Sequence, residues 1–254
     1  MAPLSAFWEV KYRYAEPAMT ELLIDIGNSR CKWAYWDGRQ LVGVRSGSVD
    51  DLLTVAAPQR AWVSCVGHAE QLVRLAEAWP GCQLLQARSE LAGCGVINGY
   101  REPARLGVDR WLALLAARSL SRAPQLVIDA GTAITLDLLD EFGQHKGGWI
   151  APGLGLLRHS LVQGTAAVRP ASEGDEAGFG RDTAAAVKGG CAAMLVGIVD
   201  EARSRASRLL GSQLPLRVVV SGGDGPLLAA ARSDWQWVDH LVLRGLAVVA
   251  ARHP

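Results

Sequence analysis

The chain has 254 residues, long enough for two domains of roughly 100 to 150 residues each. Half of its residues are hydrophobic and a fifth are charged, which excludes a disordered or collagen-like protein. Its 26 basic and 25 acidic side chains leave a formal charge of +1, so the broad positive field that attracts nucleic acid is absent and no nucleic-acid partner is expected.

The N-terminal stretch 1–18 mixes aromatic and charged residues and has no apolar segment of signal-peptide length. Because Met19 stands just before the first hydrophobic run, we predict that 1–18 is a disordered extension that the fold does not need. The five cysteines include no Cys-x-x-Cys pair and are typical of reduced thiols in the cytoplasm. No uninterrupted apolar run reaches the roughly 20 residues of a membrane helix, so no membrane partner is expected.

The first half begins with a strand that ends in an Asp-x-Gly turn. Leu22–Ile24 is a short apolar run, Asp25-Ile26-Gly27 follows it, and Cys31–Tyr35 then leads to a turn at Asp37-Gly38. This order predicts a β-hairpin. Hydrophobic periodicity predicts three further elements, namely a strand at Arg60–Val66, a helix at Glu70–Trp79 and a strand at Gln83–Gln86.

A helix is predicted over Gly107–Leu120, because apolar residues recur at helical spacing from Val108 to Leu115. The first turn of this helix contains Asp109. The pattern breaks at 121–124, where we place the boundary between two halves of the chain.

The second half opens as the first half does. Leu126–Ile128 is an apolar run that ends in Asp129-Ala130-Gly131, and Ile134–Leu138 then alternates as a strand does. Two strands that each end in Asp-x-Gly indicate two similar halves. We therefore predict domains at 19–122 and 123–254.

The rest of the second half alternates between helices and a strand. A long helix is predicted from Thr183 to about Leu210 and a closing helix at Leu241–Ala251. Between them, Val218–Val220 reads as a strand that ends in the glycine-rich Ser221-Gly222-Gly223. The whole chain is thus predicted to be a mixed α/β protein.

The first turn combines the groups that a metal-bound triphosphate needs. From Asp25 to Lys32 the sequence supplies a carboxylate at a strand end, a glycine, hydrogen-bonding side chains and a cation. Backbone N–H groups and the Ser29 hydroxyl can hold phosphate oxygens, Lys32 can offset their charge, and Asp25 can hold Mg²⁺ through water. The alternative is a tight hairpin with an Asx turn and no ligand.

The second turn, Asp129–Ala133, repeats the carboxylate, the glycine and the small polar residue. One copy alone is more often a turn than a site, but two copies favour a nucleotide held between them. The glycine-rich strand end at 221–225 can let an adenine or ribose lie flat against the backbone, although such a segment is also an ordinary strand-to-helix loop. Neither Gly-x-x-x-x-Gly-Lys-Ser/Thr nor Gly-x-Gly-x-x-Gly occurs, which excludes a P-loop and a Rossmann site.

Six ordered motifs carry a resemblance to a known family. They are Asp25–Lys32, Asn98-Gly99-Tyr100, Gly107–Trp111, Asp129–Ala133, Gly147–Gly153 and Gly180–Thr183. With these motifs the chain after Met19 resembles the type III pantothenate kinases, members of the superfamily that joins sugar and acetate kinases with actin. The resemblance implies two ribonuclease-H-like (actin-like ATPase) domains with mixed sheets flanked by helices, a homodimer, and phosphorylation of pantothenate by ATP as the first step of coenzyme A biosynthesis.

The same resemblance implies a role for individual residues. The residues that would bind ATP with Mg²⁺ are Asp25, Ile26, Gly27, Asn28, Ser29, Arg30, Cys31, Lys32 and Thr132. The residues that would bind pantothenate are Tyr100, Gly107, Val108, Asp109, Arg110 and Thr183. Asp109 would be the general base, and Asp129 would hold a monovalent cation, K⁺ or NH₄⁺.

Other interpretations remain open for the site and for the function. Asp109 can be a first-turn carboxylate that complements the helix dipole, Arg110 a surface charge, and Tyr100 an aromatic side chain that packs beside a turn. The chain can also be a non-catalytic nucleotide-binding regulator on the same fold, or another phosphotransferase or a phosphatase of the superfamily, because fold alone does not set the substrate. The segment Gly107–Trp111 favours pantothenate.

Overall fold

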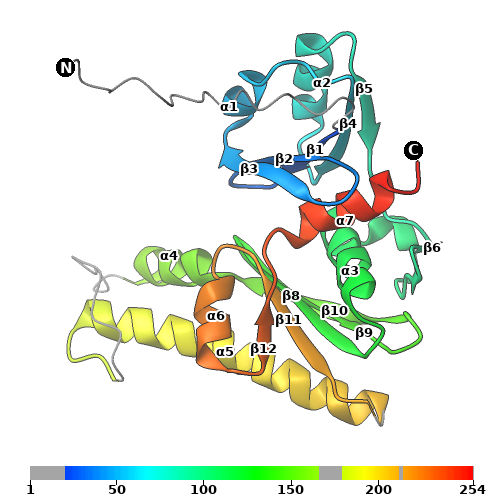
Figure 1. Ribbon diagram of the computed structural model, residues 1–254. Coiled ribbons are helices and arrows are strands. Elements are labelled where there is room, and N and C mark those ends of the chain that lie inside the picture. The colour runs from blue at the N-terminus through cyan, green and yellow to red at the C-terminus, as the bar shows by residue number, and fades with distance from the viewer. Residues whose placement is uncertain (1–20, 166–178, 212–213, 254) are drawn as a thin grey trace, which may run out of the picture.

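The computed structural model describes residues 21–165, 179–211 and 214–253. These residues form two five-stranded sheets, one above the other in Figure 1, with helices between them and around them. The predicted N-terminal extension 1–18 lies outside the described residues, and the predicted boundary at 121–124 falls in the connection between α3 (Val108–Leu120) and β8 (Gln125–Ala130).

The first sheet has the strand order β3-β2-β1-β4-β5. Its strands are β1 (Glu21–Ile26), β2 (Cys31–Trp36), β3 (Leu41–Gly47), β4 (Arg60–Cys65) and β5 (Gln83–Gln86). The pairs β1–β2 and β2–β3 are antiparallel, whereas β4 and β5 run parallel to β1. Two helices, α1 (Val49–Leu53) and α2 (Ala69–Ala78), belong to the same half.

The second sheet repeats this arrangement with the order β10-β9-β8-β11-β12. Its remaining strands are β9 (Ala133–Leu139), β10 (His145–Pro152), β11 (Arg217–Ser221) and β12 (Trp235–Trp237). The helices α4 (Leu154–Gly164), α5 (Thr183–Leu210) and α6 (Gly225–Ala231) accompany it. Again three antiparallel strands are followed by two parallel ones, as in the ribonuclease-H-like fold, so the predicted fold class is confirmed.

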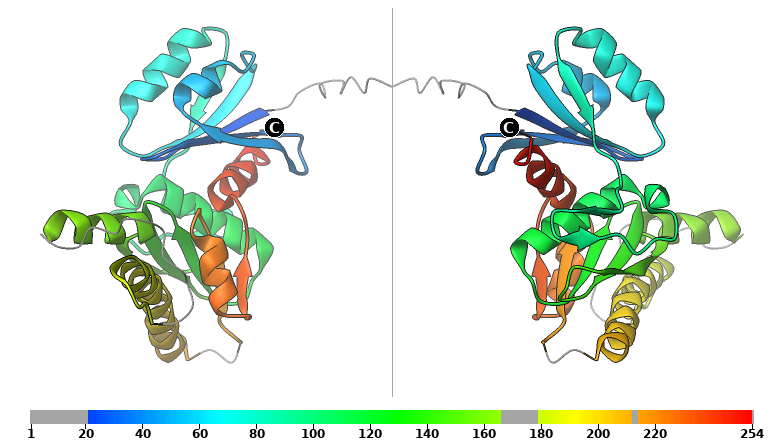
Figure 2. Two further views of the ribbon diagram at one scale, coloured as in Figure 1. Left: turned by 90° about the vertical axis from the view of Figure 1, so that its left-hand side faces the viewer. Right: turned by 90° about the vertical axis from the view of Figure 1, so that its right-hand side faces the viewer.

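The helices α3 and α7 (Leu241–Ala250) join the two sheets. Figure 2 shows both helices in the layer between the sheets. Their buried residues, among them Trp111, Leu112 and Leu246, share one core cluster with residues of both sheets. The two helices pack closely, because a Cβ atom on Gly245 of α7 would lie 2.1 Å from the carbonyl oxygen of Leu112. A short hairpin of β6 (Ala92–Gly93) and β7 (Val96–Ile97) and the 3₁₀ turn Pro103–Arg105 precede α3.

The long helix α5 spans Thr183–Leu210, as its periodicity predicts, although Gly189 and Gly190 lie inside it. By length and composition α5 is apolar enough to cross a membrane, with a mean hydropathy of 1.4 over 18 residues. The helix still contains no uninterrupted apolar run of roughly 20 residues, because Lys188 lies in its first half and Asp200 begins a charged second half.

Candidate active site

The two Asp-x-Gly turns lie against each other. The Ser29 hydroxyl, in the turn between β1 and β2, is 2.7 Å from the Thr132 hydroxyl, in the turn between β8 and β9. These residues are 103 positions apart in the chain. Because both hydroxyl groups can rotate to donate to an anion, the contact identifies a place where the two halves can hold one phosphate chain together.

The two aspartates occupy matching positions in the two sheets. Asp25 of β1 is paired in register with Ser64 of β4, and Asp129 of β8 is paired with Ser221 of β11. Across the hairpin, Lys32 of β2 lies opposite Asp25. The repeat predicted from sequence thus extends to the placement of the carboxylates.

Burial and mutual repulsion disfavour negative charge on these aspartates. Burial, together with the negative charge of Asp129, raises the pKa of Asp25 to about 7, although the positive charge of Lys32 opposes the shift. Burial also raises the pKa of Asp129. The positive charge of Lys32 lowers this pKa, whereas the negative charge of Asp109 raises it. Three carboxylates therefore interact around one lysine, an arrangement typical of sites that bind cations.

The donor set fits a metal ion that is shared with a nucleotide. No group of three or more His, Cys, Asp or Glu side chains forms a metal cage within the described residues. Mg²⁺ commonly takes one or two protein carboxylates and completes its shell with water and phosphate oxygens. Asp25 and Asp129 can supply such oxygens, and a cation would relieve the repulsion between them.

Glycines outside the second turn shape it. A Cβ atom on Gly153, which ends the Gly147–Gly153 motif, would lie 2.0 Å from the Gly131 carbonyl oxygen. A Cβ atom on Gly222, whose φ is +91°, would lie 2.3 Å from the Ala130 carbonyl oxygen. Only glycine at these two positions allows the start of α4 and the end of β11 to lie so close to the turn.

Asp109 lies in the first turn of α3, where the sequence predicts it. It is half-buried, and one of its carboxylate oxygens accepts a hydrogen bond of 2.8 Å from the backbone N–H of Arg110. Its charge acts on both Asp25 and Asp129. The structure thus brings Asp109 near the two turns, and a carboxylate in that place can accept a proton from an alcohol.

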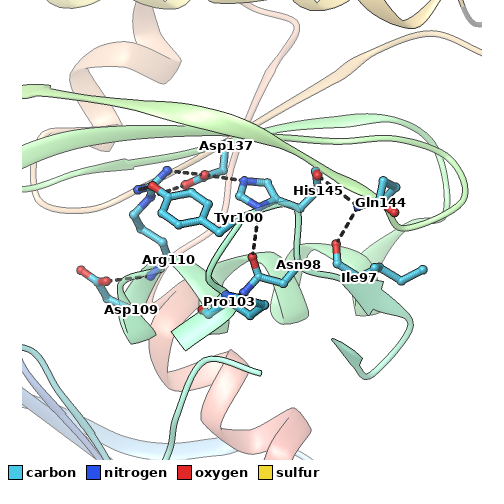
Figure 3. A network of polar contacts seen from close by, with 9 residues as sticks. All are labelled: Ile97, Asn98, Tyr100, Pro103, Asp109, Arg110, Asp137, Gln144 and His145. Atoms are coloured by element: carbon cyan, nitrogen blue, oxygen red, sulfur yellow. Dashed lines mark hydrogen bonds and ion pairs between the residues drawn. The ribbon is translucent and has the colours of Figure 1, made fainter. Parts of the chain in front are cut away.

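Arg110 is a buried residue and not a surface charge, with 5% of its area exposed. Its Nε and Nη2 atoms donate to both oxygens of Asp137 at 2.8 and 2.6 Å, and its Nη1 donates to the Tyr100 hydroxyl at 2.6 Å (Figure 3). Two of its guanidinium nitrogens, Nε and Nη2, are thus already paired with a protein carboxylate.

The Asn98-Gly99-Tyr100 motif holds the tyrosine in this place. The Asn98 amide donates to the carbonyl oxygens of Glu90 and Pro103, and its own oxygen accepts from the Tyr100 backbone N–H at 3.0 Å. Gly99 packs against the backbone of His145, where a Cβ atom would lie 1.9 Å from the carbonyl oxygen. Tyr100 is therefore fixed at both its backbone and its hydroxyl group.

The predicted residue Thr183 and the main cavity beside the first turn do not coincide with this centre. Thr183 is exposed at the start of α5, and no described hydrogen bond or ion pair connects it with Asp109 or Tyr100; Figure 1 shows α3 and the start of α5 at opposite ends of the second sheet. A cavity of about 430 Å³ opens beside the first turn, between Gly27–Cys31, Ser46–Val49 and the start of α2. Neither Asp129 nor Thr132 lines that cavity, so phosphates between the two turns would lie outside it.

Asp137 and His145 belong to the site and were not predicted from the sequence. His145 Nε2 is 2.8 Å from Asp137 Oδ1, and both side chains are buried. A signal was present, because Asp137 is a charge in the middle of the hydrophobic strand Ala133–Leu139, and such a charge needs a partner when it is buried. Only the folded arrangement identifies that partner as Arg110.

Known proteins resemble this chain in sequence and in fold. The family model described as type III pantothenate kinase matches residues 21–205. Type III pantothenate kinases of Chromobacterium violaceum and Laribacter hongkongensis are 41% and 38% identical to it, over 91% and 90% of this chain and 99% and 98% of theirs.

Solved structures agree with the fold. A protein described as a conserved Baf family transcriptional activator from Campylobacter jejuni aligns with a TM-score of 0.64 and 19% identity, over 92% of this chain and 98% of its own. A protein described as a 2-dehydro-3-deoxygalactonokinase from Sinorhizobium meliloti aligns with a TM-score of 0.56 and 16% identity, over the same shares. These identities bear on the fold alone, whereas the matched residues 21–205 and the close relatives decide the family: the chain belongs to the type III pantothenate kinases.

Proposed function

We propose that the protein transfers the γ-phosphate of ATP to the terminal hydroxyl of (R)-pantothenate, the first step of coenzyme A biosynthesis. The observation that carries this proposal is the meeting of the two turns at Ser29 and Thr132, with the carboxylate of Asp109 close enough to act on both aspartates. Phosphoryl transfer needs positioned phosphates and an oriented alcohol more than a covalent nucleophile. The family of the chain supports the same reaction.

Each turn has its own task in the proposal. The first turn, Asp25–Lys32, holds the phosphates of ATP with its backbone N–H groups, Ser29 and Lys32, and Asp25 would hold Mg²⁺. In the second turn, Thr132 contacts ATP and Asp129 would hold K⁺ or NH₄⁺. When bound at Asp25 and Asp129, these cations would offset the negative charge of the phosphoryl oxygens.

Pantothenate is held by α3 and the loop before it. Gly107, Val108 and Tyr100 border the substrate, Arg110 holds the Tyr100 hydroxyl, and Asp109 accepts the proton of the attacking alcohol. A general base of this kind works best when its carboxylate is ionised and within hydrogen-bond reach of the hydroxyl. All five cysteines are free thiols, which supports a location in the reducing cytoplasm.

An assay of ADP release tests the proposal. Purified protein with ATP and Mg²⁺ should release ADP when pantothenate is added, faster with K⁺ than without, and should not respond to a panel of sugars. Release with a sugar but not with pantothenate would point to another phosphotransferase. ATP binding without turnover of any acceptor would favour the non-catalytic regulator, which the retained Asp25, Asp109 and Asp129 argue against.

A homodimer through α5 is part of the proposal. One face of α5 is exposed and carries no charge, and it consists of Ala186, Gly190, Ala193, Met194 and Gly197. These positions recur at helical spacing, and Thr183 lies three residues before Ala186 on the same face. A second chain that packs on this face would bury it and bring its own Thr183 toward the substrate site.

Replacing Gly197 with arginine should turn the dimer into a monomer. A Cβ atom at Gly197 meets no atom within 4 Å, so the substitution leaves the single chain undisturbed and blocks only the approach of another helix. Sedimentation velocity measures the result. Gly81→Arg is the matched control, because Gly81 has equally open surroundings in the other half; a dimer that survives Gly197→Arg would contradict this interface.

Replacing Gly107 with alanine should lower kcat by about 10- to 100-fold, the scale of a displaced catalytic group. The added Cβ atom would lie 2.5 Å from an Asp109 carboxylate oxygen and would turn that side chain away. The melting temperature should change little, because the conflict is with a side chain that can move. Steady-state kinetics and thermal melting check both outcomes. Gly155→Ala, which meets open space in α4, should leave kcat unchanged, and an equal loss there would contradict the explanation.

A further inference from the structure

We propose that Asp137 and His145 are positioning residues that act through Arg110 to orient the Tyr100 hydroxyl, so that its proton is donated to an acceptor oxygen of pantothenate. This inference rests on the proposed function and extends it to two residues that do not touch the substrate. Figure 3 shows the four side chains in one continuous network.

The network is rigid because each of its charges is paired. Arg110 and Asp137 form a bidentate ion pair with both side chains 4% exposed. Paired hydrogen bonds between a guanidinium and a carboxylate fix both planes relative to each other. The remaining nitrogen of Arg110, Nη1, can then point only where Tyr100 lies, at 2.6 Å.

The direction of the Tyr100 hydrogen follows from the chemistry of arginine. A guanidinium group only donates hydrogen bonds, so the Tyr100 oxygen must accept from Arg110. The phenolic proton therefore points elsewhere, and no described residue accepts it. A phenol that accepts from a cation is a stronger donor on its other side, which suits a carboxylate or carbonyl oxygen of the substrate.

His145 completes the network from the other side of Asp137. Because the paired carboxylate of Asp137 only accepts, His145 Nε2 must carry the hydrogen of their 2.8 Å contact. The buried Nδ1 atom on the other side of the ring has no partner among the described residues. The ring also stacks on Tyr100, with centroids 5.9 Å apart and planes 14° apart.

The backbone around the network leaves no room for another arrangement. A Cβ atom on Gly148 of β10 would lie 2.3 Å from Asp137 Oδ1 and 2.7 Å from Arg110 Nη2. The edge strand can thus cover the ion pair only with glycine at this position. The alternative is that the ion pair only stabilises the folded protein. Buried ion pairs, however, often add little net stability over apolar replacements.

A double-mutant cycle separates the two interpretations. Tyr100→Phe alone should lower kcat/KM for pantothenate by about 10- to 100-fold, the effect of one lost hydrogen bond to the substrate. Asp137→Asn alone should lower it by about 10-fold, through KM for pantothenate and not through KM for ATP. In the Tyr100→Phe background, Asp137→Asn should add almost nothing, because its effect passes through the missing hydroxyl.

The control and the rescue use residues of the same strand pair. Asp140, directly after β9, is also buried and forms an ion pair with Lys146, so Asp140→Asn should leave both KM values unchanged. Should Asp137→Asn not fold, His145→Leu replaces it in the cycle, and His145→Gln, which keeps an N–H group for Asp137, should restore KM.

Each outcome decides the inference. Non-additive losses of kcat/KM, with both KM values unchanged in Asp140→Asn, support the inference. If the fold-losses of the two variants multiply, or if KM for ATP changes as much as KM for pantothenate, the ion pair is structural and the inference is overturned. A wild-type protein that releases no ADP with pantothenate would instead overturn the proposed function, and the inference with it.

Discussion

Replacing Asp109 with asparagine should lower kcat by about 100-fold or more, the scale of a lost general base. Asparagine keeps the size and the hydrogen bond to the Arg110 backbone N–H but cannot take a proton from the alcohol. ATP binding and the melting temperature should stay close to those of the wild type. Single-turnover kinetics at saturating ATP and pantothenate, together with calorimetric ATP binding, would measure both.

A matched control exists in α2. Glu70 occupies the second position of that helix, as Asp109 does in α3. If Asp109 served only the helix dipole, Asp109→Asn would cost about 0.3 to 1 kcal/mol of stability and nothing else. Glu70→Gln would likewise leave turnover unchanged. Near-normal turnover in Asp109→Asn would remove the aspartate from the mechanism.

Replacing Asp25 with asparagine should lower kcat/KM for ATP by about 100- to 1000-fold, comparable to the loss of one preorganised electrostatic group. The amide cannot neutralise a metal ion beside the phosphates. The same variant should be more stable than the wild type when no ligand is bound and the pH is 8. Asp25 thus supports activity and lowers the stability of the unliganded protein, a combination that is common at active sites.

The sign of the stability effect follows from the pKa of Asp25. Burial raises that pKa from its ordinary value to about 7, so the folded protein holds a proton that the unfolded chain releases near pH 4. The wild type therefore loses stability as pH rises from about 4 to 7, by about 1 to 3 kcal/mol once partial exposure is taken into account. Asp25→Asn removes that loss.

Thermal melting at pH 4, 6 and 8 without ligand measures this difference. The two proteins should melt alike at pH 4 and diverge by several degrees at pH 8. Asp51→Asn is a control with a pKa shift of the opposite sign, because hydrogen bonds from Ser48 lower the pKa of Asp51. This replacement should not stabilise the folded protein. A wild type that melts higher than Asp25→Asn at pH 8 would contradict the electrostatic account.

Local sequence patterns were sufficient for most elements of the fold. The helices α3 and α5 and the strands β1 and β8 appear where periodicity predicts them. The strand β10 was missed, because Gly147, Gly148 and Pro152 interrupt its pattern. These residues are tolerated since β10 is an edge strand and since Gly148 must leave space for the Arg110–Asp137 pair.

The parts of the candidate site that are local in the sequence could be predicted. The parts that depend on tertiary contacts could not. Each Asp-x-Gly turn is readable in the sequence, and their repetition indicates that they act together. That Ser29 meets Thr132, or that Arg110 pairs with Asp137, depends on how α3 packs on the second sheet. Thr183 remains a prediction, because only a second chain could bring it to Asp109.

The protein should move one phosphate from ATP to the terminal hydroxyl of pantothenate. Phosphorus NMR and mass spectrometry of a reaction with purified protein, ATP, Mg²⁺, K⁺ and (R)-pantothenate test it most directly. One phosphate monoester on the primary alcohol is expected for each ADP formed. ADP that accumulates with free phosphate and unmodified pantothenate would contradict it.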